Sequence, residues 1–368
     1  MNNIRALRKL YHCTAVPLLL VQQKSEFMSF AAADEIRRWC GRVLDLWLAR
    51  TELPSRLVLE RSRVKLRDYG DEVNRPSVLI IPAPIKKPYI WDLMPSVSVV
   101  LACLQARFRV YVLEWTEDSP DNGLTVYADD ILLECAEIIG ESAILVGHSL
   151  GGTFATIFAS LHPERVRSLI LLEAPLSFSG IDAGTIADRI RIAPPTEALR
   201  KISTYPGTFL NALSLAASPK SFLWWRWRDL LLSAGDAAAL HTHLLVERWT
   251  LDEYAMPSAL FADVVDLYRE DRFMRGTLRI KGQTAAPKGV TMPVLAVVDR
   301  ESDLVPPNSV MPFLDALPNR NWTLLHYEGD TGVALRHVGV LAGRNAHRIL
   351  WPEILAWARM SVGYARRS

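Results

Sequence analysis

The segment from Ala143 to Gly152 constrains the fold of this chain more than any other stretch. An apolar run of β type meets the pattern Gly147-x-Ser149-x-Gly151, and a helical pattern follows it. This layout predicts a nucleophile elbow, in which a strand ends, the chain turns sharply and a serine hydroxyl is exposed at the start of a helix. Glycines flank the serine because such a turn packs its neighbours too closely for a Cβ atom. Ser149 is therefore a candidate nucleophile, with the N–H groups of a helix N-terminus behind it.

The size and charge of the chain narrow the class of protein. With 368 residues, half of them apolar, it can bury a large core, and its length suits an α/β enzyme that carries an inserted cap. A net charge of +2 gives no argument for a nucleic-acid partner. The four cysteines lack a C-x-x-C spacing, and no Cys/His cluster has the spacing of zinc ligands. We therefore expect free thiols in a reducing compartment, with neither a metal nor a cofactor.

The N-terminus resembles a weak signal peptide. A basic start precedes an apolar run over residues 11–21, but His12, Thr14 and Pro17 interrupt the run, and no clean Ala-x-Ala cleavage site follows. No stretch of the chain reaches the length of about 18–20 apolar residues that a membrane span needs. The sequence favours a cytoplasmic protein without a membrane span, and export is the alternative.

Alternation of strands and helices dominates the middle and the end of the chain. Strand-like apolar runs and helical patterns follow one another, which predicts a doubly wound α/β fold with a mostly parallel sheet flanked by helices. Several runs are apolar without alternation, as expected for strands covered on both faces. Strands are expected at about 56–69 (two), 77–81, 108–115, 143–148, 166–172, 292–298 and 322–327, and helices at 96–106, 125–139, 151–161, 308–317 and 348–360.

The chain divides into three parts on this pattern. Residues 1–54 form an N-terminal helical extension, in which an amphipathic helix over 26–50 packs on the main domain or a partner; a second copy of the chain or a membrane surface is the alternative for this helix. Residues 55–175 and 289–368 form the core. Residues 176–288 interrupt the alternation as a helical cap rich in aromatic residues, which serve as cap core or line an apolar site.

A nucleophilic serine needs a base that takes its proton and an acid that orients the base. The order Ser, acid, His is the one expected for an α/β-hydrolase fold. His337 is the histidine that lies in a loop after the last predicted strand, so it is the candidate base. Asp303 follows the strand after the cap and precedes Leu-Val-Pro-Pro, which makes it the candidate acid. Asp299 is its rival and Asp330 a weaker third.

Two backbone N–H groups are expected to form an oxyanion hole. One is that of Leu150, directly after the nucleophile, and the other lies near Ile85, in the loop after strand 77–81. This loop, residues 82–93, is rich in proline and polar residues. Loops at the carboxyl ends of parallel strands are where α/β sheets place ligand groups, although a rigid connector is the alternative here.

Seven segments of the chain match the motifs of one known family. They are Ile81–Leu93 (family pattern P-P-x-I-N-K-x-Y-I-L-D-L), Phe108–Trp115, Glu247–Asp252, Tyr268–Gly282, Asp303–Pro307 (acid loop), Arg336–Gly339 (base loop) and Trp351–Trp357 (W-P-x-W). Together these segments resemble polyhydroxyalkanoate synthases, a family of the α/β-hydrolase superfamily, and the resemblance covers about residues 55–360. The chain differs from the family at three positions: the family has a nucleophilic cysteine where this chain has Ser149, glycine at Arg336 and usually asparagine at Lys86.

The resemblance implies an enzyme that transfers acyl groups from a thioester of CoA or a carrier protein, or acts on an ester. Cysteine exchanges acyl groups with thioesters at nearly matched energy, whereas serine forms a more stable oxyester that suits one transfer or hydrolysis. We therefore expect an acyltransferase or thioesterase without a cofactor. The alternatives are a polymerising synthase, an ester or polyester hydrolase, and a non-catalytic scaffold partner of a synthase complex. A homodimer stays open.

Overall fold

The computed structural model describes residues 29–48, 50–62, 64–70, 72, 74–116, 119–180, 183–218, 224–333 and 335–364. The signal-like segment at residues 11–21 and Cys13 lie outside this range. The other three cysteines, Cys40, Cys103 and Cys135, are free thiols. Among the helices of the described residues, none combines the length and apolarity that a bilayer span requires.

A central sheet of eight strands runs through the described part of the chain, in the order β1-β2-β4-β3-β5-β6-β11-β12. Pairing is parallel from β4 through β12, while β1 and β2 add an antiparallel edge. This confirms the predicted mostly parallel sheet. The strands are β1 (Arg56–Glu60), β2 (Val64–Asp68), β3 (Ser77–Ile81), β4 (Arg109–Trp115), β5 (Ala143–His148), β6 (Val166–Leu172), β11 (Val294–Asp299) and β12 (Trp322–Tyr327).

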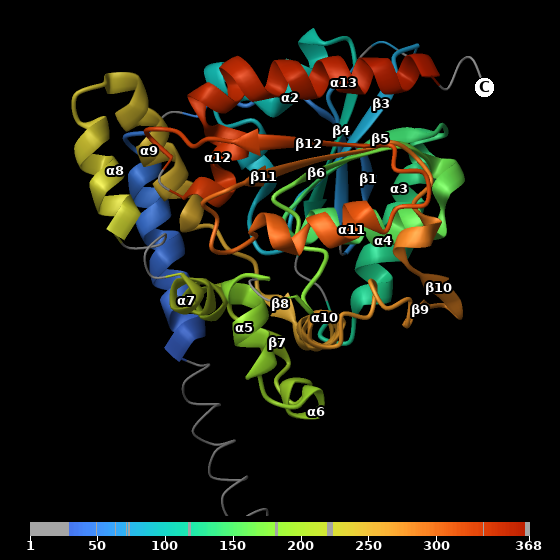
Figure 1. Ribbon diagram of the computed structural model, residues 1–368. Coiled ribbons are helices and arrows are strands. Elements are labelled where there is room, and N and C mark those ends of the chain that lie inside the picture. The colour runs from blue at the N-terminus through green and yellow to red at the C-terminus, as the bar shows by residue number, and fades with distance from the viewer. Residues whose placement is uncertain are drawn as a thin grey trace, which may run out of the picture.

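Helices cover both faces of the sheet, as Figure 1 shows. On the face at the top of that view lie α2 (Val99–Gln105) and α13 (Trp351–Tyr364), and on the other lie α3 (Ile131–Ile139), α4 (Leu150–Leu161) and α11 (Met311–Asp315). Helix α12 (Arg336–Ala342) lies beside the left ends of β11 and β12 in this view. Two buried apolar clusters correspond to these two layers. Every residue of β3, β5 and β11 is buried, because helices cover both faces, and this explains their continuous apolar runs.

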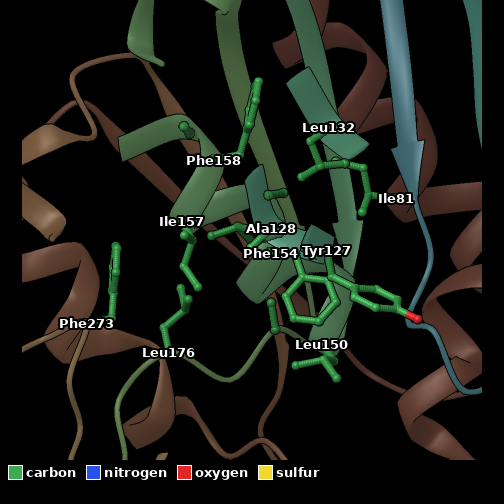
Figure 2. Packing of buried hydrophobic residues seen from close by; sticks show 14 of the residues in the cluster. Ile81, Tyr127, Ala128, Leu132, Leu150, Phe154, Ile157, Phe158, Leu176 and Phe273 are labelled. Atoms are coloured by element: carbon green, nitrogen blue, oxygen red, sulfur yellow. The ribbon is translucent and has the colours of Figure 1, made fainter. Parts of the chain in front are cut away.

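Helix α4, which begins directly after the elbow, is the most enclosed helix of the core. Figure 2 labels members of α4 and of the buried cluster around it, and it shows the Phe154 and Tyr127 side chains next to each other. The Phe154 ring centroid is 6.1 Å from that of Tyr127 and 6.3 Å from that of Trp115. A helix that is apolar on all sides is stable only when it is enclosed, so α4 gives Ser149 a rigid support.

The segment between β6 and β11 is largely helical, as predicted, but it also contains two short antiparallel strand pairs. Its helices lie below and to the left of the sheet in Figure 1. The elements are α5 (Thr185–Arg191), α6 (Thr196–Leu199), β7 (Thr204–Tyr205), α7 (Gly207–Ala217), α8 (Trp225–Ser233), α9 (Ala237–Thr250), β8 (Met256–Pro257), α10 (Ser258–Arg269), β9 (Leu278–Ile280) and β10 (Gln283–Ala285).

Several predicted helices are shorter or less regular than the pattern indicated. The helix expected at 125–139 starts as a π-helix. The one expected at 308–317 contracts to α11, with Pro312 in its first turn, where the missing N–H of proline costs no helical hydrogen bond. The π-helical segments are η3 (Val126–Asp130) and η8 (Ala346–Leu350). The short 3-10 helices are η1 (Pro88–Trp91), η2 (Pro95–Val97), η4 (Pro163–Arg165), η6 (Pro287–Gly289) and η7 (Pro307–Ser309).

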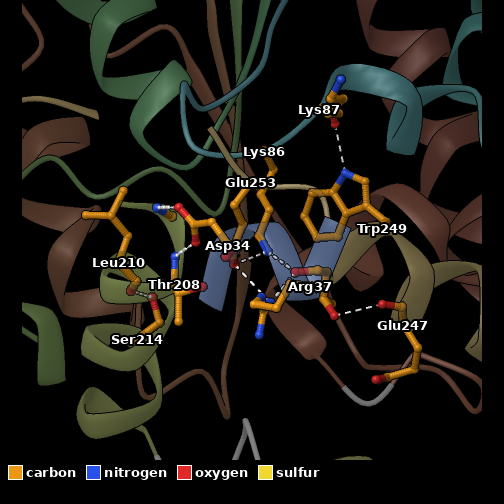
Figure 3. Close-up of polar contacts among 12 residues, drawn as sticks. Asp34, Arg37, Lys86, Lys87, Thr208, Leu210, Ser214, Glu247, Trp249 and Glu253 are labelled. Carbon is orange, nitrogen blue, oxygen red and sulfur yellow. Dashed lines mark hydrogen bonds and ion pairs between the residues drawn. The ribbon is translucent and has the colours of Figure 1, made fainter. Parts of the chain in front are cut away.

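The N-terminal helix, residues 29–45, packs on the segment between β6 and β11 (Figure 3). Asp34 is buried and accepts the backbone N–H groups of Gly207 and Thr208 at 3.0 and 2.6 Å, so it caps the N-terminus of α7. Arg37 donates to the carbonyl oxygen of Thr250 at 2.6 Å. These contacts confirm the interpretation that this helix packs on the rest of the chain.

Candidate active site

Ser149 occupies the sharp turn between β5 and α4, as the elbow motif predicts. Its φ of 54° and ψ of −132° lie outside the regions that a side-chain-bearing residue ordinarily adopts. Such a backbone costs about 1–3 kcal/mol and persists only where the surroundings impose it. Its N–H donates to the carbonyl oxygen of Leu172 at 3.0 Å, which fixes the turn against the end of β6.

Close packing explains the glycines of the elbow. A Cβ on Gly147 would lie 2.8 Å from the backbone nitrogen of Gly152, and one on Gly151 would lie 2.6 Å from the carbonyl oxygen of Pro82. Backbone atoms cannot move aside as a flexible side chain can, so both predictions of a glycine requirement are confirmed. The same contact shows that the loop after β3 lies directly against the N-terminus of α4.

The loop after β3 is held from three sides. The Trp115 indole N–H donates to the carbonyl oxygen of Pro82 at 2.7 Å. The N–H of Tyr254 donates to the carbonyl oxygen of Ile85 at 2.8 Å, and Lys86 forms a buried ion pair with Glu253. Leu150 is the first residue of α4, so its N–H is among those that a helix leaves without an internal partner. Leu150 and Ile85 stay predictions for the oxyanion hole.

Burial lowers the pKa of Lys86 to about 8, and the charge of Glu253 opposes this shift. Figure 3 shows the Lys86 side chain reaching Glu253 beside Trp249. The Trp249 indole N–H also donates to the carbonyl oxygen of Lys87 at 2.8 Å. Nothing in the sequence pattern indicated this pairing, because its partners are separated by more than 160 positions. It attaches the loop to the end of α9.

His337 lies in the first turn of α12, so the prediction that it lies in a loop was wrong. Helix α12 begins at Arg336, one residue earlier than the base. The His337 ring lies 4.7 Å, centroid to centroid, from that of His148, the residue before Ser149. The Nε2–H of His148 donates to the carbonyl oxygen of His337 at 2.8 Å. The structure thus brings the predicted base to the elbow.

Asp303 is exposed on the loop after β11. Its carboxylate accepts from the hydroxyl of Ser218 at 3.4 Å, and its carbonyl oxygen accepts from the N–H and hydroxyl of Thr185 at 2.9 and 3.1 Å. Among the interactions of the described residues, none joins Asp303 to His337. Asp303 stays a prediction for the acid.

The two rival carboxylates are engaged with other groups. Asp299 is fully buried and binds the Arg336 guanidinium through both carboxylate oxygens, one of these bonds measuring 2.8 Å. It also accepts the N–H of Glu301 at 2.8 Å. Asp330 accepts from the Tyr327 hydroxyl at 3.0 Å and caps the start of η8. Both therefore have structural partners of their own.

Glu173 is the carboxylate that the sequence analysis missed. It directly follows β6, is fully buried, and places Oε2 at 3.6 Å from Nδ1 of His337. Its Oε1 accepts the backbone N–H of Asp299, and its own N–H donates to the carbonyl oxygen of Val297 at 3.0 Å. The only signal in the sequence was an acidic residue at the end of a strand that is otherwise apolar.

The enclosed environment lowers the pKa values of the two histidines and raises that of Glu173. Burial lowers the pKa of His337 to about 4, against an opposing effect from Asp299. Burial, with the charge of His337, lowers the pKa of His148 to about 3. Burial and the nearby Asp299 charge raise the pKa of Glu173 well above its usual value. The His337 imidazole is therefore neutral at pH 7 and can accept a proton.

Two buried thiols and the polar clusters are other candidate sites among the described residues. Burial raises the pKa of Cys103 to about 12 and that of Cys135 further, so neither is a reactive thiolate. Within the same residues, no group of three or more His, Cys, Asp or Glu side chains is arranged to hold a metal ion. A surface pocket of about 370 Å³, lined by residues that include Arg344 and Arg348, shares no lining residue with the Ser149 region.

Comparison with known proteins places this geometry in a family. The family model of the alpha/beta hydrolase fold matches residues 101–329, more than half of the chain. The enol-lactonase from Burkholderia xenovorans covers 83% of this chain with all of its own, at a TM-score of 0.53 and 13% identity. A carboxylesterase from Nitrososphaera gargenis covers 84% of this chain and 99% of its own, at a TM-score of 0.51 and 16% identity. These two structures share the fold.

Sequence relatives are more specific. The poly(3-hydroxyalkanoate) polymerase subunit PhaC of Synechocystis sp. is 28% identical, over 83% of this chain and 84% of its own length. The subunit of the same name from Haloferax mediterranei is 27% identical, over 83% of this chain and 63% of its own length. This chain spans less than two thirds of the Haloferax relative. With its elbow, its sheet and these matches, the chain belongs to the alpha/beta hydrolase fold family and is similar to polyhydroxyalkanoate polymerase subunits.

Proposed function

We propose that this protein is an acyl-transfer enzyme with Ser149 as nucleophile and His337 as base, acting on an acyl thioester of CoA or a carrier protein. The observation that carries the proposal is the strained Ser149 turn close to His337, a largely enclosed histidine whose low pKa keeps it neutral. Backbone strain at a serine next to a base is typical of a reacting centre.

The reaction proceeds in two balanced steps. His337 Nε2 takes the hydroxyl proton as Ser149 Oγ bonds to the acyl carbon, and the departing thiolate takes that proton when the carbon–sulfur bond breaks. Water or a hydroxyl or amine acceptor then gives a proton to His337 and attacks the acyl-serine. The bond between the acyl carbon and Ser149 Oγ breaks, and Oγ takes that proton back from His337 as the acyl group is released. The N–H of Leu150, with a second N–H near Ile85, stabilises the oxyanion in both steps.

Relatives named as polyhydroxyalkanoate polymerase subunits support a thioester as the acyl donor. The serine argues for a single transfer or hydrolysis, because an acyl-serine oxyester is more stable than the thioester that donates it. The second candidate function is polymerisation itself, which the names of the same relatives favour. The two candidate functions differ in their product. The first gives a free acid or a singly transferred acyl group, and the second gives a polymer.

Intact-protein mass spectrometry with a panel of acyl-CoA and acyl-carrier thioesters tests the proposal. We expect an acyl adduct on Ser149 that accumulates in the wild type under single turnover and is absent in Ser149→Ala. Cys103→Ser serves as the matched control and keeps the adduct. An adduct on a cysteine, or none with any donor and no labelling by a fluorophosphonate probe, would refute it. Free acid or transferred acyl product, rather than polymer, supports the first candidate over the second.

A further inference from the structure

Given the proposed roles of Ser149 and His337, on which this inference rests, we propose that Glu173, at the end of β6, is the carboxylate that orients His337. The residue acts through the base, so it is a positioning residue of the reaction. The acid predicted from the sequence, Asp303, lies on a different strand end, that of β11. The orienting carboxylate thus follows β6 instead of β11, its neighbour in the sheet.

Two buried atoms without partners carry this inference. Among the buried side-chain atoms of the described residues, His337 Nδ1 and Glu173 Oε2 are both without a hydrogen bond. They face each other at 3.6 Å. Buried polar atoms are almost always paired, and hydrogen bonds at a catalytic base are often long until substrate binds. A closure of about 0.5–1 Å would bring the two within hydrogen-bond distance and satisfy both.

The backbone holds Glu173 in this position. Its φ of 48° is in the left-handed region, which is uncommon for a residue with a side chain. It directly follows Leu172, whose carbonyl oxygen receives the N–H of the nucleophile at 3.0 Å. The hydrogen bond from Ser149 to Leu172, at the carboxyl ends of β5 and β6, therefore fixes Glu173 and the nucleophile relative to each other. The N–H of Asp299 holds the Glu173 carboxylate itself.

Competing carboxylates cannot take this role without giving up other contacts. Asp299 uses both carboxylate oxygens on Arg336, and Asp303 is exposed with Ser218 as its side-chain partner. Glu173 uses one oxygen on a backbone N–H and leaves the other toward the imidazole. Arg336 partly offsets the charge of Asp299 and so opposes the rise in the pKa of Glu173 that burial and Asp299 cause.

The pair of Glu173 and His337 titrates as a unit, and this gives a pH signature. The charged and titratable groups facing it are Asp299 from β11, Arg336 from α12 and His148 from β5. The active form has Glu173 ionised and His337 neutral with its proton on Nδ1, because Nε2 must be free to accept the serine proton. Since burial raises the pKa of Glu173, this form is populated only above that raised pKa. The carboxylate stabilises the imidazolium, so losing it shifts the acidic limb of the rate profile to lower pH.

The rate at which a fluorophosphonate probe labels Ser149, measured across pH, tests this role. We expect Glu173→Gln to slow labelling by about 10³–10⁴-fold, as loss of the orienting acid does in serine triads, and to move the acidic limb downward. Glu173→Asp should recover part of the rate, and Asp303→Asn should label like the wild type. Thermal unfolding of each variant checks that it is folded.

A spectroscopic readout keeps the test independent of the fold of Glu173→Gln. The wild type should show a strongly downfield imidazole N–H proton resonance that is lost in His337→Ala and kept in Asp303→Asn. Loss of this resonance and of labelling in Asp303→Asn, with Glu173→Gln unaffected, would overturn the role of Glu173 and leave the proposed function intact. A folded wild type that takes no label or acyl group on Ser149 would overturn both.

Discussion

The ion pair between Arg336 and Asp299 offers the sharpest test of how the site is held together. Asp299 has no exposed surface, whereas the Arg336 side chain is 26% exposed. Replacing Arg336 by methionine keeps an unbranched apolar stem but removes the guanidinium, and it leaves a buried carboxylate with only the N–H of Glu301. Removing one partner of a fully buried pair costs about 3–5 kcal/mol. Because water reaches Arg336, we expect about 2–3 kcal/mol here.

A double-mutant cycle in urea measures this pair. Arg336→Met should lose that free energy of unfolding, and Arg336→Met combined with Asp299→Asn should recover part of it, with a coupling of about 1–3 kcal/mol. The matched control is Arg344→Met, which removes the 2.8 Å pair with Asp236 on the surface and should change stability little. If the double variant is no more stable than Arg336→Met, Arg336 does not stabilise the protein by neutralising the charge of Asp299.

Three further predictions concern the elbow, acid stability and the N-terminal helix. Gly151→Ala should destabilise the protein by about 1–3 kcal/mol and slow labelling of Ser149, because the backbone at Pro82 cannot yield; wild-type stability by thermal unfolding would contradict this. His337 and His148 have pKa values lowered to about 4 and about 3 from an ordinary 6.5, so the unfolded state binds more protons and stability falls with pH below about 6.5. Each should contribute a loss of about 2 kcal/mol between pH 6.5 and 5, and urea titrations at the two pH values should show a smaller loss in His148→Phe; an equal loss would place the acid sensitivity elsewhere. Asp34→Ala should cost about 0.5–2 kcal/mol by uncapping α7 and should expose the helix at 29–45 to limited proteolysis, whereas an unchanged cleavage pattern would show that the cap does not hold it.

Much of the architecture follows from local pattern. Buried parallel strands are apolar throughout, so β3, β5 and β11 were recognisable from their composition. The elbow was recognisable because its geometry admits only glycine two residues before and two residues after Ser149. The positions of helix ends were less accurate, since His337 turned out to lie within α12 rather than before it. Helix starts depend on neighbours across the fold as well as on the local sequence.

The sequence by itself determined the α/β class, the position of the candidate nucleophile and the candidate base, because periodicity, glycine and chain order are local properties. Which carboxylate faces the base was decided only by the tertiary structure. Asp303 and Glu173 both follow sheet strands and both satisfy the order Ser, acid, His, and the Leu-Val-Pro-Pro after Asp303 favoured the former. The sheet places β6 next to β5, and the side chain that reaches His337 is that of Glu173. Contacts between strand ends depend on how strands are ordered across a sheet, and no local pattern encodes that order.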